Sequence, residues 1–370
     1  MNKTPCLWRS LTGPEDKSFR NHPIPDTIVQ HRSIHLAAFF LIAAVLDPSH
    51  LLAATGTLTA IEDFGSNPGN IRMYIYVPHN IHPNAPLVIS LHGCRQDAET
   101  YSHAGWMALA DRWKFYLVFP EQSRKNNAYR CWNWFQAEDT RRGRGEIASI
   151  VQMIRKMKSD YAIDDQRIFV EGLSAGGWMV PVLLAAYPDI FAGGATNAGG
   201  PAFCASSERP WWDVFGWWYL YTGGLEAGMC MKGIDRSPRV WGGMVQERGY
   251  GLHRGPWPRL SIWHGSADRT VNAANQQELV DQWTRLHGID TRPDGEDWMS
   301  LDGRVIHREH KDREGRTLVE TYLVEGMGHG TPIAQEPGGA CGDADNYIID
   351  VGICGVRRIG LFWGIIQSGE

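Results

Sequence analysis

The chain has 370 residues, of which 43% are hydrophobic and 21% charged, so it can bury a sizeable core as one large α/β domain or two small ones. Its net charge is -5, from 36 basic and 41 acidic residues, and no basic block stands out, so the sequence gives little support for nucleic-acid binding. It contains no Walker sequence, no GxGxxG after a first strand, no HExxH and no cysteine spacing typical of zinc sites, so we expect no metal and no cofactor.

The N-terminal segment predicts export. Residues 34–46 (IHLAAFFLIAAVL) form an apolar run of signal-peptide length, too short for a comfortable membrane span, with Arg32 before it and small residues near Ala54 after it. The long polar preface indicates either a start codon placed too far upstream or an unusually long n-region. The alternative is a buried helix of the domain. We expect residues 1–54 to be preface and signal peptide, residues 55–370 to form a single domain, and the mature chain to be secreted (extracellular or periplasmic) without a stable membrane anchor.

Strands and helices alternate along the rest of the chain. Apolar or alternating runs predict strands at 71–78, 86–93, 115–121, 167–172, 259–265 and 318–326. Helical patterns lie between or after them, at 101–113, 146–161, 275–288 and 356–366. This alternation predicts an α/β fold with a mostly parallel central sheet flanked by helices.

The segment from about 205 to 258 breaks this rhythm. It is rich in Trp and Gly without clear periodicity, so we expect an insertion beside the sheet that can roof a pocket. Trp211 and Trp212 would then line a cleft for an extended, partly apolar substrate; the alternative for them, and for Trp217 and Trp218, is packing in the core.

The stretch EGLSAGGW (171–178) places Ser174 between two glycines, after a predicted strand and before a predicted helix. This pattern is typical of a nucleophile elbow, in which a sharp turn exposes a serine hydroxyl above the sheet. A Cβ on either flanking position would collide in so tight a turn. The alternative is a serine that merely helps to turn the chain.

A serine needs a histidine to take its proton and an acid to hold that histidine. Asp268, in the loop after the strand at 259–265, is the best acid, and His329, in a glycine-rich loop after the last predicted strand, is the best base. The competing groups lie in the same interval. The competing acids Asp294, Asp297 and Asp302 fall in a polar segment that is typical of a solvated loop. Among the competing histidines, His264 ends a predicted strand and is expected to be packed. His287 also competes, and the segment with His307 and His310 is typical of an exposed hairpin or loop.

Acyl transfer also needs hydrogen-bond donors for the developing oxyanion. The backbone N–H of Ala175, directly after the serine, is one candidate. The second is the N–H of Cys94 in SLHGC, which follows an early strand. The Cys94 thiol is better explained by a disulfide than by nucleophilic chemistry. Six cysteines beyond the preface allow 15 pairings, so the sequence alone leaves the pairing open.

Several segments together resemble the esterases of the polyhydroxybutyrate depolymerase family, which includes feruloyl and acetylxylan esterases. They are LVISLHGCRQ, CWNWF, VEGLSAGG, GPWPRLSIWHGSADRTV, QWTRLHG and VEGMGHGTP. The resemblance runs in order from about residue 57 to the C-terminus. It implies an α/β-hydrolase fold, a triad of Ser174, Asp268 and His329, and the amides of Cys94 and Ala175 as oxyanion donors.

The same resemblance implies that Trp132 contacts the substrate and that three disulfides form, Cys94–Cys131, Cys204–Cys230 and Cys341–Cys354. NAGGPAFCA departs from the stretch that relatives often carry before a cysteine, and a separate polymer-binding module is missing, which weakens the case for attack on solid polymer. Pro181 should bend the helix after the serine.

We therefore expect a secreted serine carboxylic-ester hydrolase acting on esters of the oligo- or poly(3-hydroxybutyrate) type. A feruloyl or acetylxylan esterase, acting on feruloylated or acetylated polysaccharide, is the alternative within the family. A non-catalytic polymer- or carbohydrate-binding protein, suggested by the 16 tryptophans, and a serine peptidase are the alternatives of another class.

Overall fold

A computed structural model of the chain describes residues 56–206, 217–299, 304–335 and 341–367. The chain divides into two units, Met1–Ser49 and His50–Glu370, and all the strands and helices named below belong to the second unit. The predicted signal peptide and its cleavage site, Trp211, Trp212, Asp302 and the side chains of Trp217 and Trp218 lie outside the described residues. Within the described ranges, no helix has both the length and the apolar character needed to cross a membrane.

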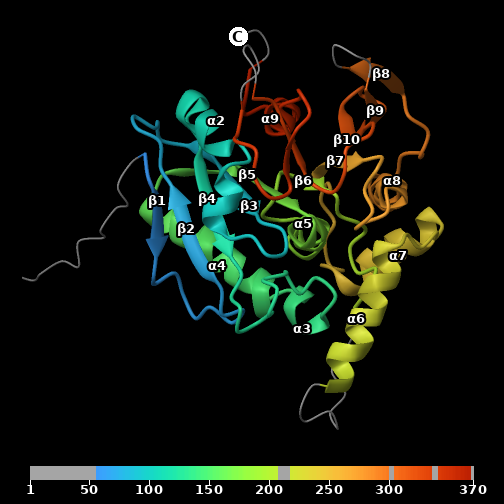
Figure 1. The fold of residues 1–370 in the computed structure, drawn as a ribbon, viewed down its shortest axis with the longest axis horizontal. Helices are drawn as coiled ribbons and strands as arrows, with labels where there is room; N and C mark the ends of the chain where they lie inside the picture. Colours follow the sequence, from blue (N-terminus) through green and yellow to red (C-terminus); the bar gives the residue numbers. More distant parts are fainter. Residues whose placement is uncertain (1–55, 207–216, 300–303, 336–340, 368–370) are drawn as a thin grey trace, which may run out of the picture. The chain divides into compact units, whose positions relative to one another are not determined.

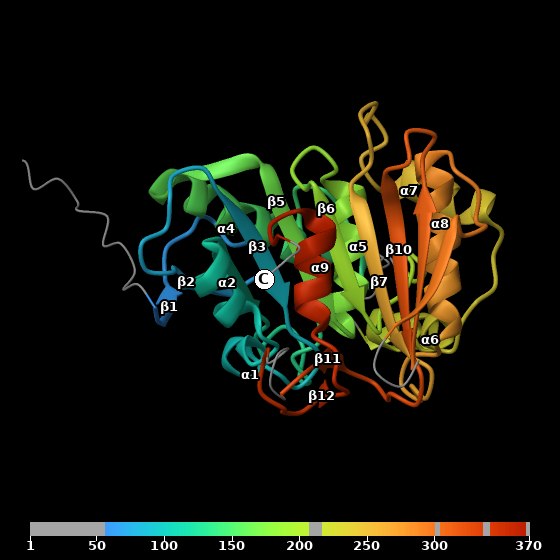
Figure 2. The same ribbon diagram turned by 90° about the horizontal axis from the view of Figure 1, so that it is seen from above.

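A ten-stranded sheet forms the centre of this unit (Figures 1 and 2), in the order β1-β2-β4-β3-β5-β6-β7-β10-β9-β8. The six strands from β4 to β10 in this order pair in parallel, and the strands at both edges pair antiparallel. Because parallel strands present their carboxyl ends at one edge, the loops that follow β3, β5, β7 and β10 gather there. The strands are β1 Leu58–Ile61, β2 Arg72–Tyr76, β3 Ala85–Leu91, β4 Tyr116–Glu121, β5 Ile163–Leu173, β6 Gly193–Asn197, β7 Arg259–Gly265, β8 Gly295–Met299, β9 Val305–Lys311 and β10 Thr317–Val324. A separate pair is formed by β11 Thr331–Ile333 and β12 Ile348–Asp350.

Helices cover both faces of the sheet. Alternate residues of β5 show this directly: Val170 packs in the core under α4, α5, α7 and α8, whereas Phe169 packs in the core under α2 and α9. Figure 2 shows α2 and α9 on one side of the sheet and α4 and α5 on the other. The helices are α1 Ala98–Ser102, α2 Trp106–Trp113, α3 Ala137–Thr140, α4 Gly145–Asp160, α5 Ala175–Ala186, α6 Trp217–Met231, α7 Pro238–Arg248, α8 Ala274–His287 and α9 Gly355–Trp363.

The predicted strands and three of the four predicted helices are present with shifted ends, and the mostly parallel α/β sheet is confirmed. The single helix predicted at 101–113 was wrong in part, because a turn at residues 103–105 divides it into α1 and α2. The expectation that His307 and His310 lie in an exposed hairpin or loop was wrong in part. They do belong to the β8–β9 hairpin, but His310 is 2% exposed, and His307 stacks on Tyr322 with ring centroids 4.4 Å apart. Neither is available as a base at the carboxyl edge.

The Trp/Gly-rich segment contains two helices, α6 and α7, inserted between β6 and β7 (Figure 1). The absence of clear periodicity in the sequence was therefore misleading. Trp241 of α7 is fully buried, and its indole N–H donates to Oε2 of Glu278 on α8 at 2.6 Å. This tryptophan holds the insertion against the domain and does not line a cleft.

Candidate active site

Ser174 lies at the sharp turn between β5 and α5. Its φ of 56° and ψ of −118° are costly for any residue with a side chain, and its N–H donates to the carbonyl oxygen of Asn197 at 2.9 Å. The flanking glycines are sterically required. A Cβ on Gly172 would lie 2.6 Å from the carbonyl carbon of Gly176, and a Cβ on Gly176 would lie 2.3 Å from the carbonyl oxygen of Leu91. The sequence therefore forces a strained serine into a tight strand-to-helix turn.

Asp268 and His329 meet across the carboxyl edge of the sheet. Asp268 follows β7 and His329 follows β10, and Nδ1 of His329 lies 2.7 Å from Oδ2 of Asp268. The other carboxylate oxygen accepts the N–H groups of Thr270 and Val271 at 2.8 and 2.9 Å. Burial favours the neutral acid, but hydrogen bonds from His264 and His329 outweigh it and hold the pKa of Asp268 well below its usual range.

His264 lies on the other side of the same carboxylate. It is fully buried, with Nε2 3.0 Å from the carbonyl oxygen of Val271 and 3.4 Å from Oδ2 of Asp268. With Nε2 protonated it donates toward both oxygens, which supports Asp268 from below. Its burial keeps it away from any substrate, as the sequence indicated.

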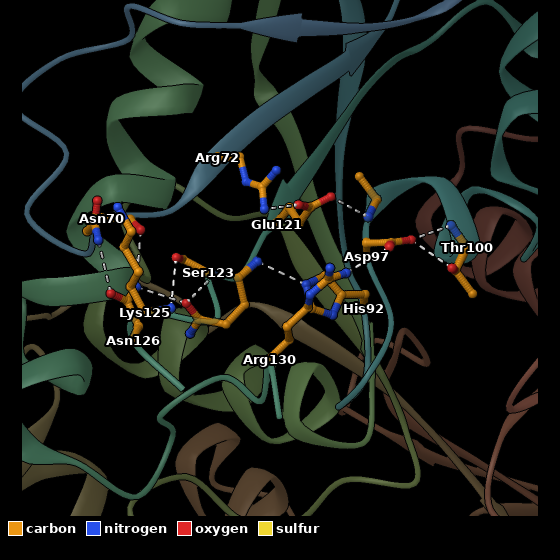
Figure 3. Close-up of polar contacts among 12 residues, drawn as sticks. Asn70, Arg72, His92, Asp97, Thr100, Glu121, Ser123, Lys125, Asn126 and Arg130 are labelled. Atoms are coloured by element: carbon orange, nitrogen blue, oxygen red, sulfur yellow. Dashed lines mark hydrogen bonds and ion pairs between the residues drawn. The ribbon is translucent and has the colours of Figure 1, made fainter. Parts of the chain in front are cut away.

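The loop that carries Cys94 is fixed by buried polar contacts. Nε2 of His92 accepts the N–H of Gln122 at 3.0 Å, and the N–H of Gly93 donates to Oε1 of Gln96 at 2.7 Å. Burial lowers the pKa of His92 to about 4, so the ring is neutral and can accept this bond at neutral pH. Figure 3 shows His92 beside Arg130 and Asp97, whose side chains form an ion pair at 2.7 Å.

The N–H groups of Cys94 and Ala175 are the candidate oxyanion donors. Among the described residues, the structure gives neither amide a hydrogen-bond partner. Cys94 forms a disulfide with Cys131, which ties its loop to the CWNWF segment. The other two pairs that the resemblance implies, Cys204–Cys230 and Cys341–Cys354, are also disulfides.

The structure corrects the role expected for Trp132. Its side chain is fully buried, and its indole N–H donates to the carbonyl oxygen of His92 at 2.9 Å. It therefore packs behind the Cys94 loop instead of contacting a substrate. The neighbouring Asn133 is held by Glu146 of α4, which accepts both its backbone N–H and its side-chain amide at 2.9 Å.

A second buried carboxylate, Glu171, lies three residues before Ser174 on β5. It accepts hydrogen bonds from four side chains at 2.5 to 3.1 Å: Ser90 on β3, Tyr101 on α1, Trp106 on α2 and Asn197 on β6. Burial raises its pKa to about 7, despite these four donors. Because Asn197 also accepts the N–H of Ser174, this network fixes the elbow from beneath.

A cavity of about 290 Å³ opens above these groups and contains both Ser174 and His329. Its other walls come from segments far apart in the sequence. They are Gly93, Cys94, Arg95, Tyr129, Cys131, Leu173, Met231, Thr270 and Tyr347. Among the described residues, no group of His, Cys, Asp and Glu side chains is arranged to hold a metal ion.

Sequence reasoning missed several of these residues. Glu171 carried a usable signal, because a single acid inside the apolar run RIFVEGL has to find buried donors. Arg95 lies within the quoted segment LVISLHGCRQ, and Tyr129 lies two residues before CWNWF, but nothing in the pattern shows that their side chains line a cavity. Met231 and Tyr347 gave no signal.

Comparisons with known proteins identify the family of the chain. The family model described as Esterase PHB depolymerase matches residues 72–208. Poly(3-hydroxyalkanoate) depolymerase C of Paucimonas lemoignei is 45% identical over 339 residues, which cover 90% of this chain and 77% of that protein. The chain belongs to the polyhydroxybutyrate depolymerase family of esterases.

Other relatives extend the likeness within the family. An acetylxylan esterase of Coprinopsis cinerea is 31% identical over 75% of this chain and 70% of its own length. Among solved structures, an acetyl xylan esterase from Aspergillus awamori superposes with a TM-score of 0.68 at 25% identity, covering 84% of this chain and all of that chain. These findings confirm the α/β-hydrolase fold and the assignment as a carboxylic ester hydrolase.

Proposed function

We propose that this esterase acts through Ser174, His329 and Asp268 by way of an acyl-enzyme. The observation that carries the proposal is the 2.7 Å contact between His329 Nδ1 and Asp268 Oδ2, beside a cavity that also contains Ser174. With Nδ1 donating to the carboxylate, Nε2 is left as the unprotonated nitrogen that can accept the hydroxyl proton. A binding protein would have no need for a strained serine with this pair in the same cavity.

The proposed reaction has two halves. Ser174 Oγ attacks the ester carbonyl carbon as His329 Nε2 takes its proton. In the tetrahedral intermediate that forms, the oxyanion accepts hydrogen bonds from the N–H groups of Cys94 and Ala175. Collapse of this intermediate expels the alcohol, which takes the proton from His329. Water then attacks the acyl-enzyme with His329 again as base, and the acid product leaves.

For the substrate we propose short esters of 3-hydroxyalkanoic acids. The support is the 45% identity to a poly(3-hydroxyalkanoate) depolymerase, which exceeds the 31% identity to the acetylxylan esterase. The cavity is small and partly apolar, lined by Leu173 and Met231, which suits short alkanoate units. Acetylxylan or feruloyl ester hydrolysis is the second candidate, because the acetyl xylan esterase from Aspergillus awamori superposes on this chain over its full length.

The test is fluorophosphonate labelling together with a product-release panel. We expect the wild type and Ser66→Ala, a control at an exposed serine, to take up the label, and Ser174→Ala to lose both label and turnover. The panel contains 3-hydroxybutyrate oligomers, acetylated xylan and feruloyl-arabinose. Release from the sugar esters alone would contradict the substrate proposal but leave the mechanism standing. Normal turnover by Ser174→Ala would overturn the mechanism.

We also propose that the mature chain is secreted. Three disulfides favour an oxidising compartment, and the apolar run at 34–46 has signal-peptide length. Intact mass of the protein recovered from the medium or periplasm, before and after reduction, checks both points. A chain that retains residues 1–54, or that carries free thiols, would contradict the proposal.

A further inference from the structure

Arg95 lies in the wall of the Ser174 cavity, directly after Cys94. Its backbone is fixed in the left-handed region, at a φ of 68°, and its N–H donates to the carbonyl oxygen of Tyr129 at 2.7 Å. Its guanidinium carbon lies 5.5 Å from the centroid of the Tyr129 ring, which lines the same cavity. The cation is therefore held near one face of an aromatic ring at the mouth of the site.

The charges around Arg95 are unbalanced. The nearby Arg130 is paired with Asp97 at 2.7 Å (Figure 3), whereas the described residues provide no ion pair for Arg95. Among the described residues that line the cavity there is no Asp or Glu. Asp268, the acid of the proposed triad, is paired with His329 and is not part of the lining. A guanidinium offers parallel N–H donors that fit a carboxylate, and none of these is committed to an acid of the described residues.

We propose that Arg95 binds the free carboxylate of the substrate, so that the enzyme prefers the acid end of a short hydroxyalkanoate chain. The inference rests on the proposed ester hydrolysis at Ser174 and adds to it which ester bond is cut. In a chain of 3-hydroxy acids, the terminal carboxylate lies only three bonds from the oxygen of the last ester. A carbonyl bound at the Cys94 N–H therefore leaves that carboxylate close to the next side chain along the loop.

The consequence is a preference for ends over interior bonds. Each cut at the acid end releases one hydroxy acid and leaves a new carboxylate for the next cycle. Ester bonds in the interior of a long chain lack the charge, and they gain nothing from Arg95.

The experiment compares a pair of substrates, the 3-hydroxybutyrate dimer and its methyl ester, which differ in the terminal charge; cleavage is followed at the ester bond between the two units, because the methyl ester adds a second ester bond. The readout is the ratio of kcat/KM for the acid to kcat/KM for the ester. We expect Arg95→Gln to lower this ratio about tenfold, since a charge-assisted hydrogen bond at a solvated site is lost. Arg95→Lys should keep part of the preference, because it retains the charge without the fork.

Arg124→Gln is the matched control. It removes the same charge from an exposed position of the same region that is not part of the cavity wall, and its ratio should equal that of the wild type. Added salt should lower the wild-type ratio, because the ion pair formed with the substrate is screened. A ratio unchanged in Arg95→Gln, including equal losses on both substrates, would overturn the inference.

A second pair identifies the source of the carboxylate. Acetylated xylan with uronic-acid side groups presents a carboxylate on a polysaccharide, and acetylated xylan without these groups is its uncharged partner. An effect of Arg95→Gln confined to this pair would overturn the assignment to hydroxy acids. Failure of the proposed function has a different signature, since the wild type would then hydrolyse neither the dimer nor its methyl ester.

Discussion

The indole nitrogen of Trp132 lies 2.9 Å from the carbonyl oxygen of His92, two residues before the amide that we assign to the oxyanion. The tryptophan is thereby a positioning residue for the Cys94 loop, and the ring centroids of Trp132 and His92 are 5.3 Å apart. The disulfide between Cys94 and Cys131 fixes the same two segments covalently.

Trp132→Phe should lower kcat more than it raises KM. The change leaves the His92 carbonyl without its donor and opens a small void, which together cost about 1–3 kcal/mol of stability. Trp134→Phe is the control, because Trp134 is also buried and stacks on Trp178, with ring centroids 4.1 Å apart. Steady-state kinetics and urea unfolding of both variants provide the comparison. Equal kcat values in the two variants would remove the positioning role.

Asp268→Asn should reduce kcat by about 10⁴-fold, as for acids that hold the imidazole in other triads. The asparagine amide can donate an N–H to Nδ1 of His329, and it carries no negative charge that would stabilise the imidazolium. Asp294→Asn is the control for a competing acid, since Asp294 lies by the β8–β9 hairpin, where it accepts the N–H of Lys311 at 2.6 Å. Turnover is measured at one pH for both. A silent Asp268→Asn variant would show that the acid is misassigned.

Glu171→Gln should flatten the dependence of stability on pH. The pKa of Glu171 is raised by burial from 4.5 to about 7, so between these values the folded chain binds more protons than the unfolded chain. Its contribution is fully present below about pH 4.5 and is lost as pH rises through about 7, so the free energy of unfolding falls over that window. Urea unfolding at pH 5 and pH 8 should show a smaller difference in the variant than in the wild type.

The variant should also be less stable at both pH values. One side of the amide would present N–H₂ to groups that donate to the carboxylate, which costs about 1–3 kcal/mol. Glu62→Gln, at an exposed position, should leave both the stability and its pH dependence as in the wild type. An unchanged difference between pH 5 and pH 8 in Glu171→Gln would show that Glu171 does not titrate in this range.

Removal of the Cys94–Cys131 disulfide by double substitution to alanine should cost both stability and turnover. The bond closes a loop of 37 residues, for which the chain-entropy relation gives about 4 kcal/mol. Turnover should fall because the Cys94 amide is then held by noncovalent contacts alone. Kinetics at a temperature where the variant remains folded separates the two effects. A normal kcat there would show that the disulfide serves stability only.

The sequence predicted the elements that carry a continuous apolar run or a clear helical period. It missed β6, GGATN, because that strand has no large aliphatic or aromatic residue to mark it. The structure explains the composition: a Cβ on Gly194 would lie 2.8 Å from side-chain atoms of Val180 and Leu184 on α5. Because α5 packs so closely on β6, this strand has no room for the large apolar side chains by which a strand is recognised in a sequence.

The site divides in the same way. Ser174, Asp268 and His329 could be placed from the sequence because turn glycines and their position after strands mark them. Trp132 was misjudged because a tryptophan beside a functional loop has the same appearance in the sequence whether it faces the cavity or the core. Arg95 could not be placed, since the direction of its side chain depends on a backbone contact with Tyr129, 34 positions further along the chain.

The order of the site residues along the chain has a consequence for biosynthesis. The Cys94 loop and Ser174 belong to the first half of the chain, whereas Asp268 and His329 follow β7 and β10. A ribosome that has completed β6 has made Ser174 and both proposed oxyanion amides but neither the proposed base nor the proposed acid. If the proposed mechanism holds, we expect hydrolytic activity only after the C-terminal strands have joined the sheet, so that a nascent or truncated chain would not attack esters.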